Sequence, residues 1–395
     1  MTLQVVVIGA GVIGAAVSHQ VAKVAQVRVL DVVTQPGHGG ATRSTWAWLN
    51  ANKKHPQHYR DLNLAGLRRW KTEWPSLVQP CGSLVFEDDD ASLSDPVYPA
   101  QRLAPSQVRE LEPFVSEEMA ARGANLYSQE AWVDPHVACQ EMLRSAQQDG
   151  AEVLLGPGHR VTGLLTRQEP SASPASAAEG QGVTRVTGVV TEDGATHAAD
   201  VVVLAAGAEV MRLAAQAGVT VPMLHKPAVS ALTQPLAGHG RRLVRHLLAN
   251  SKVFVWQRPD GSVILGDTLA HEDGSAAWGE SLLQRATELV PELAAAGARV
   301  ERVEVAYRPW PKDGHPIIGG STACRGLYVA TMHSGMTLAP EVARLVAAEL
   351  RHWDVAAGAA VGTHPELLEA QSVLQPYRLE RDFEEGVRRA AYSWK

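Results

Sequence analysis

The sequence is poor in cysteine and has no long apolar run. Its three cysteines, Cys81, Cys139 and Cys324, lie far apart, form no CxxC pair and are odd in number. This pattern argues against a disulfide framework, and we expect three reduced thiols and no metal site. A membrane-spanning helix is not expected either, because no uninterrupted stretch of roughly 18 apolar residues is present.

A strong excess of one charge is also missing. The chain of 395 residues carries 36 Lys and Arg against 42 Asp and Glu, a net charge of −6. This balance gives no reason to expect nucleic acid or an anionic membrane as a partner. Only Met1 to Leu3 precede the first apolar run, with no basic region or cleavage site, so the cytoplasm is the default expectation. A homo-oligomer is compatible with the sequence, but no sequence feature indicates one.

The N-terminal region has the pattern of a βαβ unit. The short apolar run Gln4–Ile8 predicts a buried strand, and a helical pattern follows from Ile13 to Val24. A second strand, Val27–Leu30, ends at Asp31. Such an opening favours a parallel sheet with helices on its faces.

Further elements follow from apolar spacing and from glycine and proline stops. Helices are predicted at His58–Trp74, Val137–Gln148, Leu282–Leu289 and Ala339–Trp353. Strands are predicted at Cys81–Phe86, Glu152–Leu155, Asp200–Leu204, Lys252–Arg258, Ser262–Asp267 and Leu327–Ala330. Arg160–Leu165 and Thr184–Thr191 are interpreted as hairpin arms, with Arg167–Gly182 as a flexible tip. The acidic run Asp88–Asp90 with Asp95 is interpreted as a solvated loop.

A GxGxxG motif joins the first strand to the first helix. Gly9 permits a tight turn, Gly11 lets a diphosphate approach the backbone, and Gly14 lets the helix pack close to the strand. The helix N-terminus then offers amides and a positive dipole end to phosphate. Asp31 lies 22 residues after Gly9, where a carboxylate can accept a hydrogen bond from a ribose hydroxyl. These features predict dinucleotide binding, with FAD and NAD both open at this point.

Three later segments favour FAD. The polar loop Gly39–Thr45 offers amides, hydroxyls and a guanidinium for the diphosphate. Ala205-Ala206-Gly207 follows an apolar strand with small side chains that allow close passage of the cofactor. Leu327–Pro340 forms a strand, a short turn and a helix, which would aim a second helix N-terminus into the same region. A helix dipole suits the negative charge of a reduced flavin ring.

Five segments together resemble the FAD-dependent D-amino acid oxidase superfamily, with the glycine oxidase, sarcosine oxidase and D-amino acid dehydrogenase branch closest. They are VVVIGAGVIG at 5–14, ATRSTWAW at 41–48, ADVVVLAAG at 199–207, YRPWPKDGHPIIG at 307–319 and LYVATMHSGMTLAP at 327–340. They occur in the family's order over nearly the whole chain, and the last two are the most specific.

The resemblance implies a mixed α/β fold with a discontinuous Rossmann-type FAD domain and a β-rich substrate domain. The FAD domain would comprise residues 1–80, 136–222 and 306–363. The substrate domain would comprise residues 81–135 and 223–305, followed by a helical C-terminal tail at 364–395.

The resemblance also suggests site residues. Arg308 matches the arginine that binds the substrate carboxylate, a role suited to a planar guanidinium. A structural arginine paired with a sheet-end carbonyl is the alternative. The flavin-linked cysteine of the sarcosine oxidase pattern is absent, because Tyr307 and Arg308 lie at that place and Cys324 is downstream, so we expect FAD to be bound non-covalently. Trp46 and Trp48 are bulky for a loop under the flavin and either shape a pocket or belong to the core. The full set predicted to contact FAD, with Val161 at the adenine, is Gly9, Gly11, Val12, Ile13, Gly14, Asp31, Val32, Thr42, Arg43, Ser44, Thr45, Trp46, Ala47, Trp48, Val161, Ala205, Ala206, Gly207, Ser334, Gly335, Met336 and Thr337.

The reaction implied is oxidation of the C–N bond of an amino acid or secondary amine. Hydride would pass from the α-carbon to flavin N5, and the imine would then hydrolyse. Tyr307 and His333 are candidates for a hydrogen bond to substrate or for tuning the flavin. The electron acceptor is O₂ or another carrier, which the sequence does not decide. A hydroxy acid, a larger amine-containing metabolite and a non-catalytic dinucleotide-binding module remain alternatives.

Overall fold

A computed structural model describes residues 2–87, 95–170, 182–236, 242–267, 269 and 271–383. These residues fall into two compact units, each built from separate pieces of the chain. Unit 1 contains the described residues of 1–43, 135–225 and 308–383, and unit 2 those of 44–134 and 226–307. The predicted first segment, 1–80, is therefore corrected: residues 44–80 group with unit 2.

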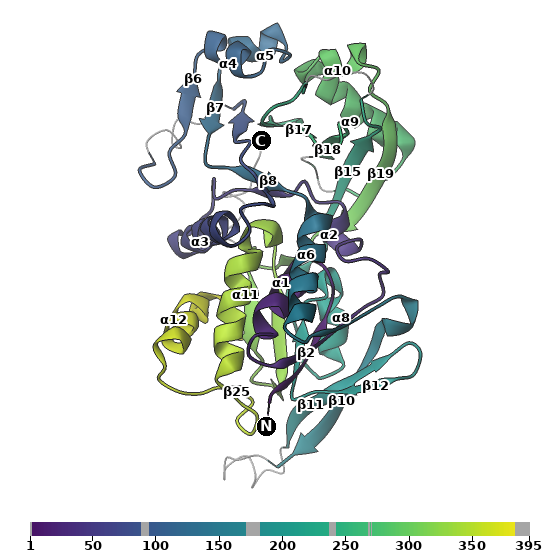
Figure 1. Cartoon of the computed structure of the whole chain (residues 1–395), viewed down its shortest axis with the longest axis vertical. Helices are drawn as coiled ribbons and strands as arrows, with labels where there is room; N and C mark the ends of the chain where they lie inside the picture. Colours follow the sequence, from purple (N-terminus) through teal and green to yellow (C-terminus); the bar gives the residue numbers. More distant parts are fainter. Residues whose placement is uncertain are drawn as a thin grey trace. The chain divides into compact units, whose positions relative to one another are not determined.

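Unit 1, drawn with the rest of the chain in Figure 1, is built around a six-stranded sheet. The strand order in this sheet is β21-β23-β13-β1-β2-β9. The strands are β21 Ile317–Gly320, β23 Leu327–Thr331, β13 Val201–Leu204, β1 Gln4–Ile8, β2 Gln26–Asp31 and β9 Glu152–Leu155. Only β21 pairs antiparallel, and the other neighbours are parallel. The central strands are apolar at nearly every position because both faces of a parallel sheet are covered.

Helix α1 packs against two other helices of unit 1, α6 and α11. The helices of this unit are α1 Val12–Val21, α2 Gly40–Arg43, α6 Pro135–Gln148, α8 Val210–Ala215, α11 Gly335–Arg351 and α12 Pro365–Leu374. Helix α11 begins four residues before the predicted Ala339, with Pro340 inside it. Proline lacks an amide donor and disfavours a preceding helical turn, which is why the sequence predicted a later start.

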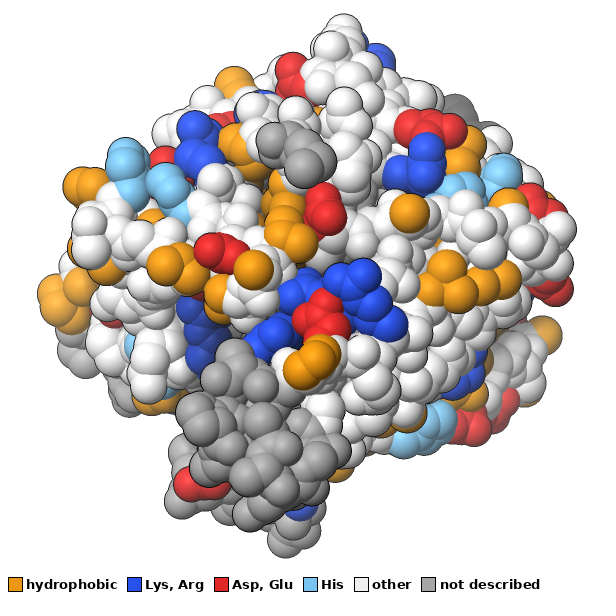
Figure 2. Space-filling model, turned by 90° about the horizontal axis from the view of Figure 1, so that it is seen from below, with side chains coloured by type: hydrophobic (Ala, Val, Ile, Leu, Met, Phe, Trp, Pro, Cys, Tyr) orange, Lys and Arg blue, Asp and Glu red, His pale blue; other side chains and the backbone are white. Residues whose placement is uncertain are grey.

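A smaller sheet of unit 1 contains the predicted hairpin. Its strands are β10 Val161–Glu169, β11 Val183–Thr191, β12 Thr196–Ala198 and β22 Cys324–Arg325. Antiparallel pairing of β10 and β11 confirms the hairpin arms, while residues 171–181 of the predicted tip lie outside the described residues. Glu169 pairs with Arg167, Arg185 and Arg325 and so joins three of these strands. Figure 2 shows one face of the molecule, on which basic side chains surround an acidic one.

Unit 2 contains an eight-stranded sheet with the order β19-β15-β18-β17-β16-β5-β7-β6. The strands are β19 Val300–Tyr307, β15 Pro227–Thr233, β18 Val263–Asp267, β17 Val253–Gln257, β16 Leu247–Ala249, β5 Ser83–Val85, β7 Ala124–Tyr127 and β6 Gln101–Leu103. Its neighbours pair antiparallel except β16 and β5. Helix α9, Ala276–Leu289, covers a core that contains Val255, Leu265 and Leu282.

Short strands explain why residues 44–80 belong to unit 2. Strand β8, Ala131–Val133, pairs with both β3, Trp48–Leu49, and β4, Val78–Gln79, and helix α3, Gln57–Glu73, lies between β3 and β4 in the chain. Two-residue strands carry no alternation that sequence reasoning can detect. The remaining short elements are α4 Pro105–Leu111, α5 Glu117–Ala121, α10 Glu292–Ala295, β14 Met223–Leu224, β20 Trp310–Pro311, β24 Trp353–Asp354 and β25 Ala359–Ala360.

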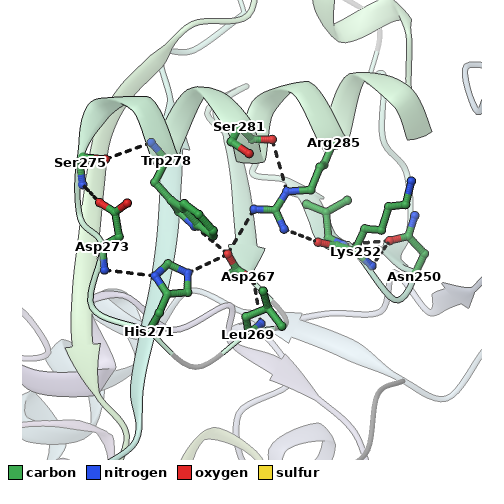
Figure 3. A network of polar contacts seen from close by, with 11 residues as sticks. Asn250, Lys252, Asp267, Leu269, His271, Asp273, Ser275, Trp278, Ser281 and Arg285 are labelled. Atoms are coloured by element: carbon green, nitrogen blue, oxygen red, sulfur yellow. Dashed lines mark hydrogen bonds and ion pairs between the residues drawn. The ribbon is translucent and has the colours of Figure 1, made fainter.

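A polar network fastens the end of β18 to helix α9 (Figure 3). The buried carboxylate of Asp267 accepts hydrogen bonds from Trp278 Nε1 at 2.7 Å and Arg285 at 3.2 Å, and it contacts His271 Nε2 at 3.0 Å. Burial alone would raise the pKa of Asp267, but these donors and the Leu269 amide lower it. The ionised carboxylate therefore fixes this strand end against the helix.

The described residues allow the expectations about cysteines, the acidic loop, membrane-spanning helices and metal sites to be compared with the structure. All three cysteines lie in the described part of the chain, and none is in a disulfide. Asp95 accepts a hydrogen bond from Arg60, whereas Asp88–Asp90 lie outside the described residues. Among the helices described, none combines the length and apolar character that crossing a bilayer requires. Within the same ranges, no three His, Cys, Asp or Glu side chains are arranged to hold a metal ion.

Candidate functional site

The glycine motif forms a turn that tolerates no side chain at two positions. Gly9 has φ 115°, and a Cβ added there would lie 2.5 Å from the carbonyl oxygen of Ala205. A Cβ on Gly14 would collide with the carbonyl oxygen of Gly9. The strand and helix α1 therefore approach each other as closely as their backbones allow, which is what the motif predicts.

The first turn of α1 is arranged to receive an anion. Its N-cap residue, Gly11, makes no side-chain cap hydrogen bond. The Val12 amide donates to Thr42 Oγ1 at 3.2 Å, so the polar loop predicted to face the diphosphate does reach this turn. Amides at a helix N-terminus and the helix dipole together favour phosphate.

Asp31 is held against the same turn. Its Oδ2 accepts from the Ala10 amide at 2.6 Å, and its Oδ1 accepts from the Val33 amide at 3.2 Å. A carboxylate has about four acceptor positions, so these bonds orient Asp31 while leaving capacity for a ribose hydroxyl. The ribose contact itself stays a prediction.

A second helix N-terminus lies beside the first. Ser334, the N-cap of α11, is left-handed with φ 60° and makes no side-chain cap hydrogen bond. A Cβ added to Gly335 would lie 3.5 Å from Ile13 Cδ1, so the first turns of α11 and α1 are in contact. Thr331 Oγ1 donates to the Gly207 carbonyl at 3.3 Å, which brings the ends of β23 and β13 together. Both helix ends and the small residues 205–207 therefore meet at one edge of the sheet.

Next to this edge is a cluster of one cation and two rings. The guanidinium of Arg308 lies 5.3 Å from the ring centroid of Trp310, and the Trp310 and His333 rings are 4.2 Å apart. His333 Nδ1 lies 3.3 Å from Ser334 Oγ. Burial lowers the pKa of Arg308, although a guanidinium remains charged at neutral pH. Sequence reasoning missed Trp310, whose signal was its position two residues after Arg308 in an extended segment.

The predicted cofactor set is not gathered in one unit. Residues Gly9 to Arg43, Val161 and Ala205 to Thr337 of the set belong to unit 1, whereas Ser44–Trp48 belong to unit 2. Tyr307 also belongs to unit 2 and is 42% exposed. Val161 is buried in a core cluster with Ile8 and Leu30, and its backbone contact to adenine stays a prediction.

The segment 44–48 is held by its own contacts within unit 2. Ala47 has φ 53°, and its amide donates to Thr45 Oγ1 at 3.1 Å. The Trp46 ring stacks on Phe254, with centroids 4.5 Å apart and an interplanar angle of 14°. Trp48 Nε1 donates to Glu130 at 2.7 Å. The side chains of Trp46 and Trp48 are both half-buried, so they are less buried than core residues and less exposed than surface residues.

Glu130 is a fully buried carboxyl group that the sequence did not point to. It accepts from Trp48 Nε1, from Tyr98 OH at 2.9 Å and from the Ser83 hydroxyl. Burial raises the pKa of Glu130 to about 7, against the opposing effect of these donors and of Lys54. Burial also lowers the pKa of Lys54 to about 8. Trp48 is therefore held by a carboxyl group whose pKa burial brings close to neutrality.

The residues of unit 1 fit FAD. Two glycine positions admit no side chain, and two helix N-termini meet where a diphosphate and an electron-rich ring would require positive potential. Val12, Ile13, Asp31 and Thr42 lie at the first of these helix ends, and Ser334–Thr337 form the second.

Known proteins agree with this assignment. The family described as FAD dependent oxidoreductase (DAO) matches residues 4–349 of the chain. Hydrogen cyanide synthase subunit HcnC of Pseudomonas aeruginosa is 25% identical over 392 residues, covering 84% of this chain and 88% of that protein. Glycine oxidase of Pseudomonas putida is 34% identical over 175 residues, covering 41% of this chain and 44% of that protein.

Solved structures share the fold. Glycine oxidase from Geobacillus kaustophilus superposes with a TM-score of 0.73 at 21% identity, covering 97% of this chain and 99% of that one. Iminodiacetate oxidase from Chelativorans sp. BNC1 gives a TM-score of 0.69 at 21% identity, covering 95% and 99%. The expected mixed α/β fold is thus confirmed. Because the family match covers most of the sequence, the chain belongs to the FAD-dependent oxidoreductase (DAO) family and is an FAD-dependent oxidoreductase.

Proposed function

We propose that this oxidoreductase oxidises the C–N bond of an amino acid or secondary amine that carries a carboxylate. The observation that carries the proposal is the Arg308–Trp310–His333 cluster, which lies directly before the N-terminus of α11. It offers a cation for a carboxylate beside the helix end that suits a flavin ring.

Arg308 binds the substrate carboxylate in this proposal. A guanidinium can hold a carboxylate through two parallel hydrogen bonds and so fix its orientation. The Trp310 ring restricts the guanidinium on one side, at 5.3 Å from the ring centroid. Partial burial strengthens the attraction, because charges interact more strongly where water is excluded.

FAD is held non-covalently by unit 1. The amides of the α1 first turn and Thr42 bind the diphosphate, and Asp31 binds ribose. The first turn of α11, from Ser334 to Thr337, would hold the flavin ring. Bound there, FAD would supply the acceptor for the hydride that leaves the substrate α-carbon.

The protein's remaining task is orientation. The substrate amine must be neutral before its lone pair can form the imine, which water then hydrolyses. In this proposal His333, which contacts the Trp310 ring and Ser334 Oγ, hydrogen-bonds the substrate or the ring. Tyr307 is the direct sequence neighbour of Arg308 and is exposed, so its hydroxyl is a second candidate for such a bond. Errors of about 1 Å in such positioning can cost roughly 100-fold in rate.

The names of similar proteins support an amine-bearing carboxylate as substrate. They include glycine oxidase, iminodiacetate oxidase and L-proline dehydrogenase from P. horikoshii. Glycine, iminodiacetate and proline each combine a carboxylate with an amine on the adjacent carbon. A cation beside the flavin end of the site suits that shared group.

Anaerobic mixing of the FAD-loaded protein with a substrate panel tests the proposal. The panel contains glycine, sarcosine, both enantiomers of several amino acids, opines, and lactate as a hydroxy acid. Loss of the visible flavin absorption with an amine, and not with lactate, is expected. Reduction by lactate alone would replace the proposal with hydroxy acid oxidation, and reduction by no compound would count against it. Admitting O₂ or a quinone afterwards identifies the electron acceptor.

A further inference from the structure

The segment 378–383 is fastened to the turn that follows β20. Arg381 holds the carboxylate of Asp313 through two hydrogen bonds, from Nε to Oδ2 at 2.7 Å and from Nη2 to Oδ1 at 2.8 Å. Arg381 Nη2 also donates to the His315 carbonyl at 3.1 Å. Both side chains of the ion pair are largely buried, with 12% of Arg381 and 11% of Asp313 exposed. A guanidinium and a carboxylate joined by two bonds fix each other in distance and in orientation.

The Asp313 side chain organises this turn. Its Oδ1 also accepts from the His315 amide at 3.1 Å. The Gly314 amide donates to the Pro311 carbonyl at 2.8 Å, and Gly314 has φ 73°, a conformation that favours glycine. Burial alone would raise the pKa of Asp313, but its contacts with His315 and Arg381 lower it, so the carboxylate stays ionised. Arg381 therefore binds the side chain on which the shape of the turn depends.

The segment that carries Arg381 is itself held in place. Leu379 is buried in a core cluster of unit 1, and Arg378 donates to Glu349 of α11 at 3.0 Å. Glu380 accepts from the Thr322 amide at 2.8 Å. The guanidinium that binds the turn is therefore supported by the core, by a helix and by a second loop.

The turn lies five residues after Arg308, and the chain between them is stiff. Residues 308–313 have the sequence RPWPKD, with proline at the second and fourth positions. Each proline fixes its own φ at about −65° and also restricts the residue before it, here Arg308 and Trp310. Few backbone rotations remain to absorb a shift of Asp313. Such a shift is therefore passed along the chain toward Arg308.

The described contacts of β20 continue this path. The Lys312 amide donates to the Pro222 carbonyl at 2.9 Å, and β20 pairs with β14. Trp310 of β20 is the ring over which the Arg308 guanidinium lies, 5.3 Å from its centroid. All residues from Arg381 to Arg308 on this path belong to unit 1. The position of the Arg308–Trp310 pair therefore depends on the strand and on the turn that ends it.

We propose that Arg381 is a positioning residue, which sets the place of the Arg308 guanidinium by holding the turn at Asp313. This inference rests on the proposed function and gives the segment 378–383 a part in substrate binding. Loss of Arg381 leaves the Arg308 cation present but displaces it. A displacement of about 1 Å can lower a rate roughly 100-fold, and a smaller shift is expected here because β14 and the prolines still restrain the segment.

Substitutions of the ion pair and of a matched pair test the proposal. Arg381→Met removes both hydrogen bonds and keeps the length of the side chain, while Arg381→Lys and Asp313→Asn are milder changes. The control is Arg344 of α11, which also holds a carboxylate through two bonds, from Nε and Nη2 to Glu341 at 3.1 and 2.7 Å. Its side chain is 18% exposed, so Arg344→Met removes a similar ion pair elsewhere in unit 1.

The first measurement is KM for the amine that reduces the flavin, with FAD content and unfolding midpoint recorded for each variant. Arg381→Met should raise KM about tenfold at normal FAD content, and Arg381→Lys and Asp313→Asn should raise it less. Arg344→Met should lower the unfolding midpoint to a similar extent and leave KM within about twofold. In an Arg308→Ala background, Arg381→Met should not raise KM further, because the guanidinium through which it acts is absent. An unchanged KM in Arg381→Met, or an equal rise in both backgrounds, would overturn the inference.

A second measurement separates this inference from the proposed function. The holoenzyme is labelled with 5-fluorotryptophan, and the ¹⁹F resonance of Trp310 is assigned by comparison with Trp310→Phe. Without any substrate, this resonance should shift in Arg381→Met and stay in place in Arg344→Met. The shift would support the role of Arg381 even if no amine reduces the flavin, a result that counts against the proposed function alone. A Trp310 resonance that stays in place in Arg381→Met would contradict the inference, whatever the substrate panel gives.

Discussion

The guanidinium of Arg308 lies over the indole of Trp310, 5.3 Å from its ring centroid, and the His333 ring contacts the same indole with centroids 4.2 Å apart. Trp310 is 8% exposed and pairs through β20 with β14. The cation is therefore supported by a ring that the sheet holds in place, and its position is set before substrate arrives. Such preorganisation is what a carboxylate-binding arginine requires.

Arg308→Ala should raise KM for a carboxylate substrate roughly 100-fold, because a charge-assisted double hydrogen bond is lost. FAD content should stay normal, since the residues that hold the diphosphate are unchanged. Arg308→Lys should recover part of the affinity, because the lysine ammonium supplies a positive charge but cannot form two parallel hydrogen bonds to the carboxylate. Steady-state kinetics and flavin absorbance per protein measure both quantities. Loss of FAD, or an unchanged KM, would assign Arg308 a structural role.

Gly14→Ala should give protein with little bound FAD. The added Cβ would collide with the Gly9 carbonyl oxygen, so the turn must open at the place where the diphosphate binds. Gly158→Ala is the control, because a Cβ there would meet only Asp193 at an ordinary 3.6 Å. We expect the FAD dissociation constant to rise at least about tenfold in Gly14→Ala and to stay unchanged in the control. Equal FAD binding by the two variants would count against this turn as the diphosphate site.

Acid precipitation of the yellow protein should release flavin into the supernatant. Covalent attachment requires a nucleophilic side chain at the ring, and the nearest cysteine downstream of Arg308, Cys324, is buried in β22. Burial raises the pKa of the Cys324 thiol, which disfavours the reactive thiolate. Absorption spectra of supernatant and redissolved pellet decide the matter. Flavin that remains in the pellet would show attachment through another residue.

The Glu130 and Lys54 pair should give stability a distinctive dependence on pH. The pKa of Glu130 is raised from 4.5 to about 7, so between these values the folded state binds a proton that the unfolded state has released. The free energy of unfolding should therefore fall as pH rises through this window, by up to about 3 kcal/mol from this group. The pKa of Lys54 is lowered from 10.5 to about 8, so its contribution rises again between pH 8 and 10.5.

Urea unfolding of the wild-type protein and of Glu130→Gln, at intervals from pH 5 to pH 7.5, measures the first window. The difference in unfolding free energy between the two proteins should shift in favour of the variant as pH rises. Lys54→Met extends the comparison to alkaline pH, where the wild-type rise should disappear. Parallel curves for the wild-type protein and Glu130→Gln would mean that the carboxyl group titrates normally.

The sequence predicted those parts of the molecule that depend on local signals. The turn between β1 and α1 was predicted from Gly9, Gly11 and Gly14, because the backbone at each position leaves little space for a side chain. Asp31 was expected near this turn, and its carboxylate accepts a hydrogen bond from the Ala10 amide there. The strands of the parallel sheet were predicted because their apolar runs are continuous. The start of α11 was placed too late because Pro340 masks its first turn.

Contacts between residues that are far apart in the sequence could not be predicted. The Trp46 ring requires a glycine at position 266, and the sequence around either residue carries no signal of this contact. Glu130 is an acidic residue in a short connection before β8, and only the folded structure reveals that it is fully buried with three donors. The assignment of residues 44–80 to the wrong unit has the same origin, because β3 and β4 are recognisable only through their partner β8.

The strand order of unit 1 has a consequence for how the protein is made. Strand β1 is flanked by β2 and by β13, and β13 begins at Val201. A nascent chain emerging from the ribosome can pair β1 with β2, and β2 with β9, early, but the other edge of β1 stays open until β13 has been synthesised. Strand β23 and helix α11 follow only after most of unit 2 has emerged. An unpaired apolar edge invites association with other chains, so shielding by a chaperone during translation would raise the yield of folded enzyme.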